Sequence, residues 1–421
     1  MKTIKLNHIT KIEGHAKLFV KIEKNKVKKA ELKIYEGSRF FEGILKNKNY
    51  NDINHIASRI CGVCSVVHNL AALRAIENAF KIKISEQTNQ LRELLNIAGI
   101  IQSHVLHLYF LALPDYLGYK NAIELASDYK NELKRALNIK KAANSVVRII
   151  GGRDVHPIAS IPGGFSRLPK QEDMKKLLKQ IILYKRDAKK TIELFSSLKY
   201  PEFERETSYF ALSGGPYFYS EQLVKCDKGV CFLTKDYENH FEEYLRKGST
   251  AEFATKEGKN YTVGALARVL ANKALLKNSK EYVEIIEKNK NNPFYNNLAQ
   301  AIEVYEGFNR MVEILENLKL KDEKLPDVKP VKSTGIGAIE APRGILFHKY
   351  SFDSEGNCTS ANITTPTTQN LADIEFSIKQ FIPKIINKPN EKIRLEIEKL
   401  IRAYDPCISC STHFLELKLE R

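Results

Sequence analysis

Two cysteine pairs at opposite ends of the chain constrain its fold more than any other feature. Two residues separate Cys61 from Cys64, and two separate Cys407 from Cys410. This spacing lets both sulfurs of a pair face one ion, and thiolates select Zn, Ni, Cu(I) or iron–sulfur centres over hard cations. If all four thiolates surround one site, the fold must bring the two ends of the chain together.

The spacing of the pairs alone leaves several chemistries open. A structural zinc ion is one, although zinc ribbons usually place their pairs within tens of residues of each other. A redox disulfide is another, but neither pair follows a thioredoxin-like βαβ pattern. The other three of the seven cysteines, Cys226, Cys231 and Cys358, are predicted to be structural thiols, because an odd count argues against a disulfide framework.

Apolar periodicity predicts an α+β fold that is mainly helical, with a central helix bundle and peripheral β-hairpins. Residues 15–37 alternate as a two-stranded hairpin does, and residues 207–262 and 331–366 favour strands and turns. Ser85 is the predicted N-cap of a long apolar helix that ends at Pro114. Further helices are expected over 120–149, 170–198, 279–290, 296–319, 369–385 and 391–403.

We expect a single domain over residues 1–421, with the metal site between its N- and C-terminal motifs. No internal repeat or low-complexity linker divides the chain. The predicted parts are an N-terminal hairpin region (1–50), a helical core (51–200), a β-rich insert (205–262), and a helical part that carries the C-terminal metal-site motif (263–421).

Composition indicates a cytoplasmic protein without a membrane span. No run of 18 uninterrupted apolar residues occurs, and the first residues lack the apolar region of a secretion signal. The formal charge is +17, from 67 Lys and Arg against 50 Asp and Glu. Because the lysines are scattered, they favour a solvated surface or an acidic partner subunit over nucleic-acid binding.

Further segments accompany the cysteine pairs. A histidine follows each pair, at His68 and His413, and Glu13 lies beside a glycine just before the first hairpin. Arg343 follows a proline in Glu-Ala-Pro-Arg-Gly, and Thr367 lies in a run of hydroxyl residues that opens a helix. Taken singly, these residues are equally consistent with a surface charge, an ion pair or a helix cap.

The order of these segments resembles the large subunit of nickel–iron hydrogenases. The motifs R-I-C-G-V-C-x-x-x-H and D-P-C-I-S-C-x-x-H form a highly specific pair, and the resemblance runs from Ile9 to His413. The segments RFFEG, QSHVLHLY, NPFYNNLAQA, EAPRGIL and RAYDPCISCS are most similar to the alpha subunit of cytoplasmic NADP-linked hydrogenases, the archaeal sulfhydrogenases. The resemblance implies reversible heterolytic cleavage of H2.

The resemblance also implies roles for individual residues. Cys61 and Cys407 would be terminal nickel ligands. Cys64 and Cys410 would bridge nickel to an iron that carries CO and cyanide. Cys407 would take the first proton.

Four other side chains would surround this centre. Glu13 would relay the proton outward. Arg343, above the open metal position, would hold a fixed charge and donate hydrogen bonds toward a cyanide ligand, or would act as an unusual base with an acid partner. Thr367 would donate a hydrogen bond to a cyanide ligand. His68 would hydrogen-bond a bridging sulfur.

A second ion site is implied near the chain end. Glu42 and His413 match ligands of a magnesium ion (or Fe2+), with a backbone carbonyl from residues 362–365 completing the protein ligands. His104 and His107 lie three residues apart on a predicted helix and could bind metal, but core packing is the more frequent role of such histidines.

Electrons must leave through other chains. Three scattered cysteines cannot hold an ordinary iron–sulfur cluster, which needs four thiolates, and Gly335-Ile336-Gly337 lacks the third glycine of a dinucleotide motif. The resemblance implies an iron–sulfur small subunit, flavin and pyridine-nucleotide subunits beyond it, further iron–sulfur subunits, and maturation proteins.

Several alternatives stay open. Electrons could pass to NAD, a deazaflavin or a heterodisulfide reductase instead of NADP. Two other classes are a zinc-stabilised nucleic-acid-binding protein and a metal-free, quinone-binding subunit of a respiratory complex.

Overall fold

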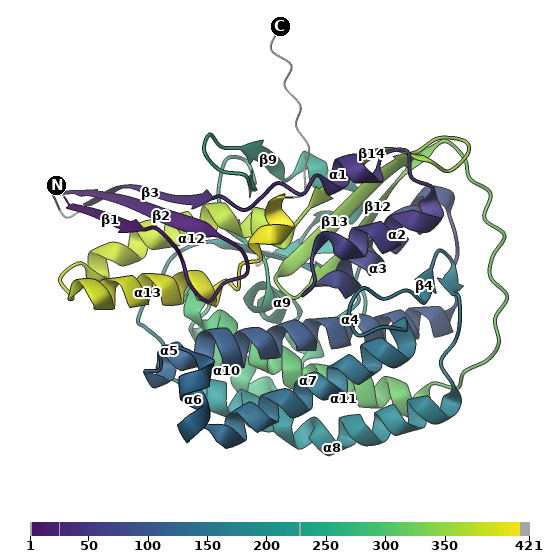
Figure 1. Cartoon of the computed structure of the whole chain (residues 1–421), viewed down its shortest axis with the longest axis horizontal. Coiled ribbons are helices and arrows are strands. Elements are labelled where there is room, and N and C mark those ends of the chain that lie inside the picture. Colours follow the sequence, from purple (N-terminus) through teal and green to yellow (C-terminus); the bar gives the residue numbers. More distant parts are fainter. Residues whose placement is uncertain (1, 25, 227–228, 413–421) are drawn as a thin grey trace, which may run out of the picture.

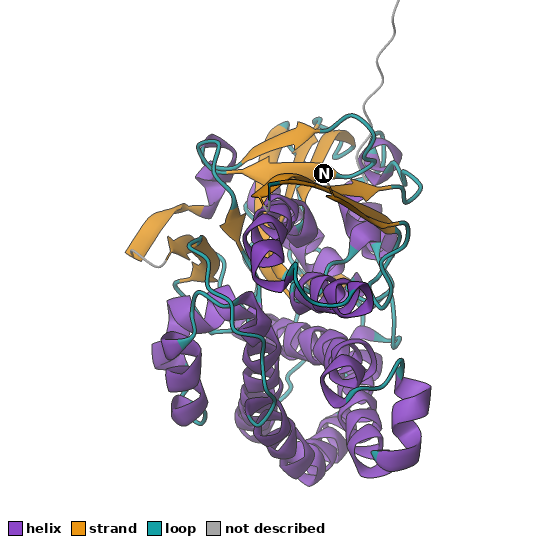
Figure 2. Ribbon diagram, turned by 90° about the vertical axis from the view of Figure 1, so that its left-hand side faces the viewer, coloured by secondary structure: helices purple, strands orange, loops and turns teal. Residues whose placement is uncertain are grey.

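The molecule has a helical layer below and a mixed layer of strands and helices above (Figures 1 and 2). The computed structural model describes residues 2–24, 26–226 and 229–412. The helices are α1 (Phe41–Leu45), α2 (Tyr50–Ala57), α3 (Ser65–Phe80), α4 (Glu86–Leu106), α5 (Leu113–Leu117), α6 (Ala122–Asp128), α7 (Lys130–Gly151), α8 (Gln171–Ser196), α9 (Ala265–Asn272), α10 (Lys280–Lys288), α11 (Asn296–Asn317), α12 (Pro366–Ile385) and α13 (Asn390–Ala403).

The strands form several small sheets instead of one large sheet. They pair in the orders β1-β2-β3, β4-β5, β11-β6-β7-β8, β10-β9 and β12-β13-β14. Their bounds are β1 (Lys2–Leu6), β2 (Ala16–Glu23), β3 (Lys26–Ile34), β4 (Ser160–Ile161), β5 (Gly164–Phe165), β6 (Ser208–Ser213), β7 (Leu223–Cys226), β8 (Gly229–Leu233), β9 (Glu242–Leu245), β10 (Glu252–Thr255), β11 (Tyr261–Thr262), β12 (Ser333–Ala341), β13 (Gly344–Phe352) and β14 (Cys358–Thr364). The predicted α+β class with peripheral hairpins is confirmed.

The long helix α4 crosses the middle of the molecule (Figure 1). The Ser85 side chain accepts a hydrogen bond from the amide of Thr88, which confirms the predicted N-cap. With a π-helical segment (His107–Ala112) and α5, the helical run Glu86–Leu117 is apolar and long enough to cross a membrane, but 78% of its most apolar stretch is buried inside the protein. Core helices pass the same test, so the run is only weak evidence for a membrane span.

The sheet β12-β13-β14 packs directly on α3. A Cβ added at Gly335 would lie 2.0 Å from the carbonyl oxygen of Ala75, and one at Gly337 would lie 2.3 Å from that of Ala71. No side chain fits at either position. The Gly-x-Gly segment therefore serves close helix–strand packing.

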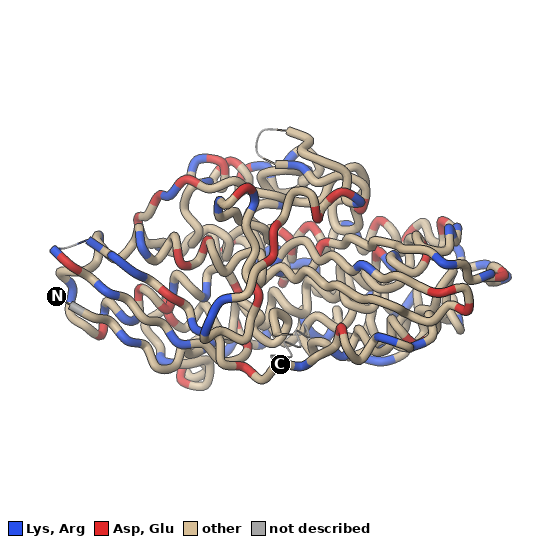
Figure 3. Tube along the Cα trace, turned by 90° about the horizontal axis from the view of Figure 1, so that it is seen from above, with Lys and Arg blue, Asp and Glu red and all other residues tan. Residues whose placement is uncertain are grey.

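The N-terminal hairpin predicted over 15–37 is confirmed as β2 and β3, and its apolar face packs on α12 and α13 at the left of Figure 1. Acidic and basic residues are interspersed along the chain (Figure 3).

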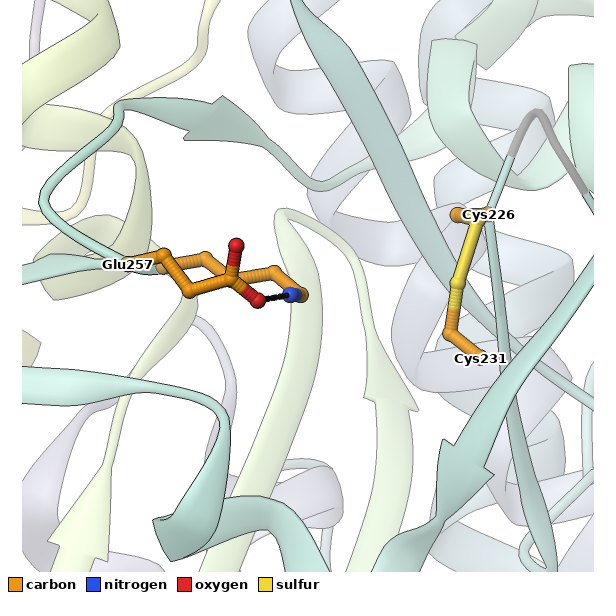
Figure 4. Close-up of a disulfide and its surroundings, with 4 residues drawn as sticks. Cys226, Cys231 and Glu257 are labelled. Carbon is orange, nitrogen blue, oxygen red and sulfur yellow. Dashed lines mark hydrogen bonds and ion pairs between the residues drawn. A yellow bond between two sulfur atoms is a disulfide. The ribbon is translucent and has the colours of Figure 1, made fainter.

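The expectation of structural thiols is wrong for two of the three remaining cysteines. Cys226 and Cys231 form a disulfide in the β7–β8 hairpin (Figure 4). Antiparallel pairing brings their Cα atoms to 6.1 Å, within the range that a disulfide spans. Cys358 is a buried free thiol, as predicted.

Candidate metal centre

The two ends of the chain meet through backbone pairing. Glu13 forms a parallel β-bridge with Cys407, and the amide of Ile408 donates to the Glu13 carbonyl at 3.0 Å. The amide of Arg39 donates to the carbonyl of Thr412 at 2.8 Å. After α13, Asp405 turns the chain with a left-handed φ of 49° and delivers Cys407 to the interior.

The four cysteines form one buried cluster. Cys61 follows a short 3-10 helix (Ser58–Ile60), and Cys64 precedes the first turn of α3. The sulfur–sulfur distances are 3.4 Å for Cys61–Cys407, 3.2 Å for Cys64–Cys410 and 3.0 Å for Cys407–Cys410. All four sulfurs lie within 4.8 Å of one another, although 346 residues separate the members of each cross pair.

This donor set fits a thiolate-bound soft metal. Hydrogen bonds from the other thiols, chiefly Cys407, hold the pKa of Cys61 well below its usual value, whereas the pKa values of Cys64, Cys407 and Cys410 are raised by the neighbouring cysteines and by burial. A small cavity beside the cluster is lined by Cys64, Cys407 and Cys410, but not by Cys61. The four sulfurs could surround one ion, and the cavity opens beside Cys64, Cys407 and Cys410.

Arg343 is a buried cation at the wall of this cavity. It lies in the turn between β12 and β13, donates from Nε and Nη2 to the carbonyl and carboxylate of Asp405, and donates from Nη1 to Ser103 Oγ at 3.2 Å. Burial acts to lower the pKa of Arg343, but the charges of Asp405 and the cysteines outweigh it and raise that pKa well above its usual value. The guanidinium therefore stays charged.

Sequence reasoning assigned no role to Asp405 or Ser103. Both were nevertheless inside quoted motifs, Asp405 directly before Pro406 and Ser103 in QSHVLHLY. An acidic residue beside a cysteine pair was the available signal for the first, whereas no sequence signal linked Ser103 to Arg343.

Glu13 and Thr367 both contact the C-terminal cysteine loop. The Glu13 carboxylate accepts hydrogen bonds from the amide of Ser409 at 2.9 Å and from its hydroxyl at 2.5 Å. The Thr367 hydroxyl accepts from the amide of Cys407 at 3.0 Å. Both side chains thus lie at the cluster, and Ser409 is an anchor for Glu13 that the sequence analysis missed.

His68 lines the same cavity from α3. Its Nδ1 lies 3.0 Å from Nε2 of His348, whose Nδ1 lies 2.5 Å from the hydroxyl of Tyr350. His348 and Tyr350 lie two residues apart on β13, so strand alternation predicts that their side chains lie on the same face of the sheet. The sequence does not predict their link to His68.

Glu42 lies beside the segment predicted to share its ion. Its carboxylate accepts a hydrogen bond from the amide of Ile363 at 2.8 Å, which joins α1 to the end of β14. His413 lies outside the described residues.

The two helical histidines belong to the core, as predicted. Nε2 of His104 lies 2.7 Å from a carboxylate oxygen of Glu303. His107 contacts the side chain of Gln300 at 2.6 Å and the carbonyl of Arg402 at 2.7 Å. Both rings are buried.

Comparison with known proteins identifies the class. The family model of nickel-dependent hydrogenases matches residues 39–135 and 249–413. The chain is 35% identical to the alpha chain of sulfhydrogenase 1 from Pyrococcus furiosus, with 98% of each chain covered. It is 33% identical to the alpha chain of sulfhydrogenase 2 from the same organism, with 98% of this chain and 100% of that one covered.

Solved structures share the fold. An NAD+-reducing [NiFe]-hydrogenase in its H2-reduced state superposes with a TM-score of 0.88 at 23% identity, over 98% of this chain and 100% of that one. The Ni-Fe-Se hydrogenase of D. vulgaris Hildenborough gives a TM-score of 0.80 at 21% identity, over the same shares of the two chains. The chain belongs to the nickel-dependent hydrogenase family and is a large, catalytic hydrogenase subunit.

Proposed function

We propose that the four cysteines hold a nickel–iron centre whose iron carries CO and cyanide, and that the enzyme cleaves and forms H2 reversibly. The observation that carries this proposal is the meeting of four buried thiols with Arg343 and Glu13, drawn from both ends of the chain. A structural zinc ion would need neither a buried cation nor an anchored carboxylate beside its thiolates.

The ligand roles come from the resemblance of the two cysteine motifs to those of nickel–iron hydrogenases. By the motif match, Cys64 and Cys410 would bridge nickel to iron, and Cys61 and Cys407 would be the terminal nickel ligands. Cys64, Cys407 and Cys410 line the cavity. When bound, the centre supplies a Lewis-acidic metal pair at which H2 is polarised for heterolytic cleavage.

The chain's own residues then handle the proton. The thiolate of Cys407 accepts it, and Glu13, held beside Cys407 by the β-bridge and by Ser409, passes it outward. A positioned carboxylate near a proton donor is the usual arrangement for such a transfer. Glu13 would therefore be the first group beyond the thiolate on the exit path.

Arg343 and Thr367 would act on the iron's cyanide ligands. Because Asp405 and the cysteines keep Arg343 charged, Arg343 would serve as a fixed positive charge and hydrogen-bond donor instead of a base. The Thr367 oxygen accepts from Cys407, which leaves its own proton available for donation. His68 would donate to a bridging sulfur.

A magnesium ion (or Fe2+) would bind between Glu42, His413 and a backbone carbonyl from residues 362–365. The contact of Glu42 with Ile363 supports this site, because it places the carboxylate against that segment.

Electrons would leave through an iron–sulfur small subunit. By likeness to the sulfhydrogenases, they would continue through flavin and further iron–sulfur subunits to NADP in the cytoplasm. Beyond the four clustered cysteines, the described residues contain one disulfide and one free thiol, Cys358. These remaining cysteines are too few to hold an iron–sulfur cluster, which needs four thiolates. Maturation proteins would insert the metals.

The test is metal analysis and acceptor assays on the complex purified without oxygen. The proposal predicts one nickel per catalytic chain, iron in excess of nickel because the partner subunits carry iron–sulfur clusters, and H2-dependent reduction of NADP+. Zinc in place of nickel would contradict the proposed centre. Reduction of NAD+ or a deazaflavin instead of NADP+ would contradict only the acceptor.

A further inference from the structure

A second buried arginine lies against the backbone of the Arg343 turn. Arg268, on α9, donates from Nη1 to the carbonyl of Ala341 at 2.7 Å and from Nη2 to the carbonyl of Pro342 at 3.0 Å. These carbonyls belong to the two residues directly before Arg343. Arg268 is fully buried.

Two buried carboxylates fix Arg268 in place. Glu303 accepts from its Nε at 2.6 Å and from Nη2 at 2.8 Å, and Glu340 accepts from Nη1 at 2.8 Å. With the two carbonyls, these bonds use all five N–H groups of the guanidinium. Five hydrogen bonds therefore fix the position of Arg268, and two of them fix the backbone of the Arg343 turn.

Gln300, one helical turn before Glu303 on α11, binds Asp405, the residue that accepts hydrogen bonds from Arg343. Gln300 donates from Nε2 to the Asp405 carboxylate at 3.1 Å, while Arg343 donates to the other oxygen of that carboxylate at 2.9 Å. Residues three apart lie on one helix face. One face of α11 thus supports both members of the Arg343–Asp405 pair. Gln300 binds Asp405 directly, whereas Glu303 binds Arg268, which in turn binds the carbonyls of the Arg343 turn.

We propose that α11 positions the Arg343–Asp405 pair at the metal cluster, with Arg268 and Gln300 as positioning residues. The proposal rests on the proposed function, in which Arg343 acts on the ligands of the iron. It requires that neither Arg268 nor Gln300 touch the reacting atoms.

The same contacts could be interpreted as a proton path from His104 through Glu303 to Tyr217, whose hydroxyl donates to Glu303 at 2.7 Å. The charge of Arg268 argues against this path. Burial acts to raise the pKa of Glu303, but Arg268 outweighs it and lowers that pKa to about 2. A carboxylate this acidic takes up a proton poorly, so Glu303 serves as a fixed counter-ion.

Arg268→Lys tests the proposal in the intact hydrogenase complex. A lysine keeps the charge but offers one donor atom, so it cannot hold both carboxylates and both carbonyls. The matched control is Arg92→Lys. Arg92 is equally buried and donates to Glu77 at 2.7 Å, but it touches no residue of the turn.

For Arg268→Lys we expect shifted infrared bands of the iron-bound cyanide and a kcat lower by about 10- to 100-fold, as misplacement near 1 Å produces, with nickel content and KM for H2 unchanged. The control should lower Tm but keep the wild-type bands and kcat. Wild-type bands and kcat in Arg268→Lys would overturn the proposal.

If Arg268→Lys does not assemble, Gln300→Met gives an independent answer. At similar volume it removes the bond to Asp405, together with the contact of Gln300 with His107, and leaves Arg268 intact. The same band shift and loss of kcat are expected, and wild-type values would overturn the proposal. Absence of CO and cyanide bands from the wild-type enzyme would contradict the proposed function instead.

Discussion

Glu13 meets the cysteine cluster through a single serine. Both carboxylate oxygens accept hydrogen bonds from Ser409, and the Glu13 backbone pairs with Cys407, so the carboxylate is held against the C-terminal cysteine loop. This anchoring is what a proton relay requires, because transfer needs a short and constant distance.

Replacing Glu13 with Gln should remove the proposed proton relay but keep the size and shape of the side chain. We expect intact nickel and iron content, while H2-driven hydrogen–deuterium exchange with solvent falls about 100-fold, the typical contribution of a positioned acid–base group. Glu36→Gln, a change at a neighbouring carboxylate outside the cluster, should leave exchange unchanged. Normal exchange in Glu13→Gln would exclude Glu13 from the proton path.

Cys407→Ser tests the ligand role of one thiol. A hydroxyl is a poor ligand for a soft metal, so the purified complex should lose most of its nickel and its activity. Cys358→Ser is the matched control, because Cys358 is also a buried free thiol but lies outside the cluster. Full nickel retention in Cys407→Ser would exclude Cys407 as a ligand.

At the scale of elements, the contact between α3 and β12 sets the frame of the site. The helix carries His68, and the strand leads into the Arg343 turn. Two glycines let the backbones approach, because any side chain there would collide with helix carbonyls. The distance between the two walls of the cavity therefore depends on Gly335 and Gly337.

Gly337→Ala should force β12 away from α3. Overpacking of this kind costs about 1–3 kcal/mol of unfolding free energy, which denaturant titration of the purified protein measures. Gly37→Ala is the control, since its added Cβ would meet nothing within 4 Å. Equal stability of the two variants would show that the close contact is not required.

The buried charges on α11 make an acid-sensitive contribution to stability. The pKa of Glu303 is lowered to about 2 in the folded protein, whereas a glutamate in the unfolded chain has a pKa of about 4.3. The stabilisation by the Glu303 charge is therefore fully present above the unfolded-state pKa and is lost as the pH falls toward the folded-state pKa. The excess of wild-type Tm over that of Glu303→Gln should therefore shrink between pH 5 and pH 3. A constant difference would contradict the lowered pKa.

Sequence reasoning predicted most elements, because alternation and helical periodicity report directly on burial. It placed the 15–37 hairpin and the Ser85 cap correctly, but the central helical run continues past the predicted end at Pro114 to Leu117. It missed the Cys226–Cys231 bridge because the cysteine count says nothing about which strands pair. It also gave no role to the glycines of β12, whose partners lie on α3.

At the scale of the whole molecule, the cysteine site depends on the two chain ends coming together. The motifs predicted the four cysteines, Glu13, Arg343 and Thr367, all of which the fold gathers. The supports behind them, Ser409, His348 and Arg268, were not predicted. Their contacts join segments that have no shared pattern in the sequence.

The central claim is a nickel–iron centre with CO and cyanide held by four cysteines from both ends of the chain. Infrared spectroscopy of the native complex, purified without oxygen, tests it most directly. A nickel–iron centre of this kind gives stretching bands of metal-bound CO and cyanide. A fully metallated complex that shows no such bands and contains zinc would exclude the nickel–iron centre and favour a structural role for the cysteines.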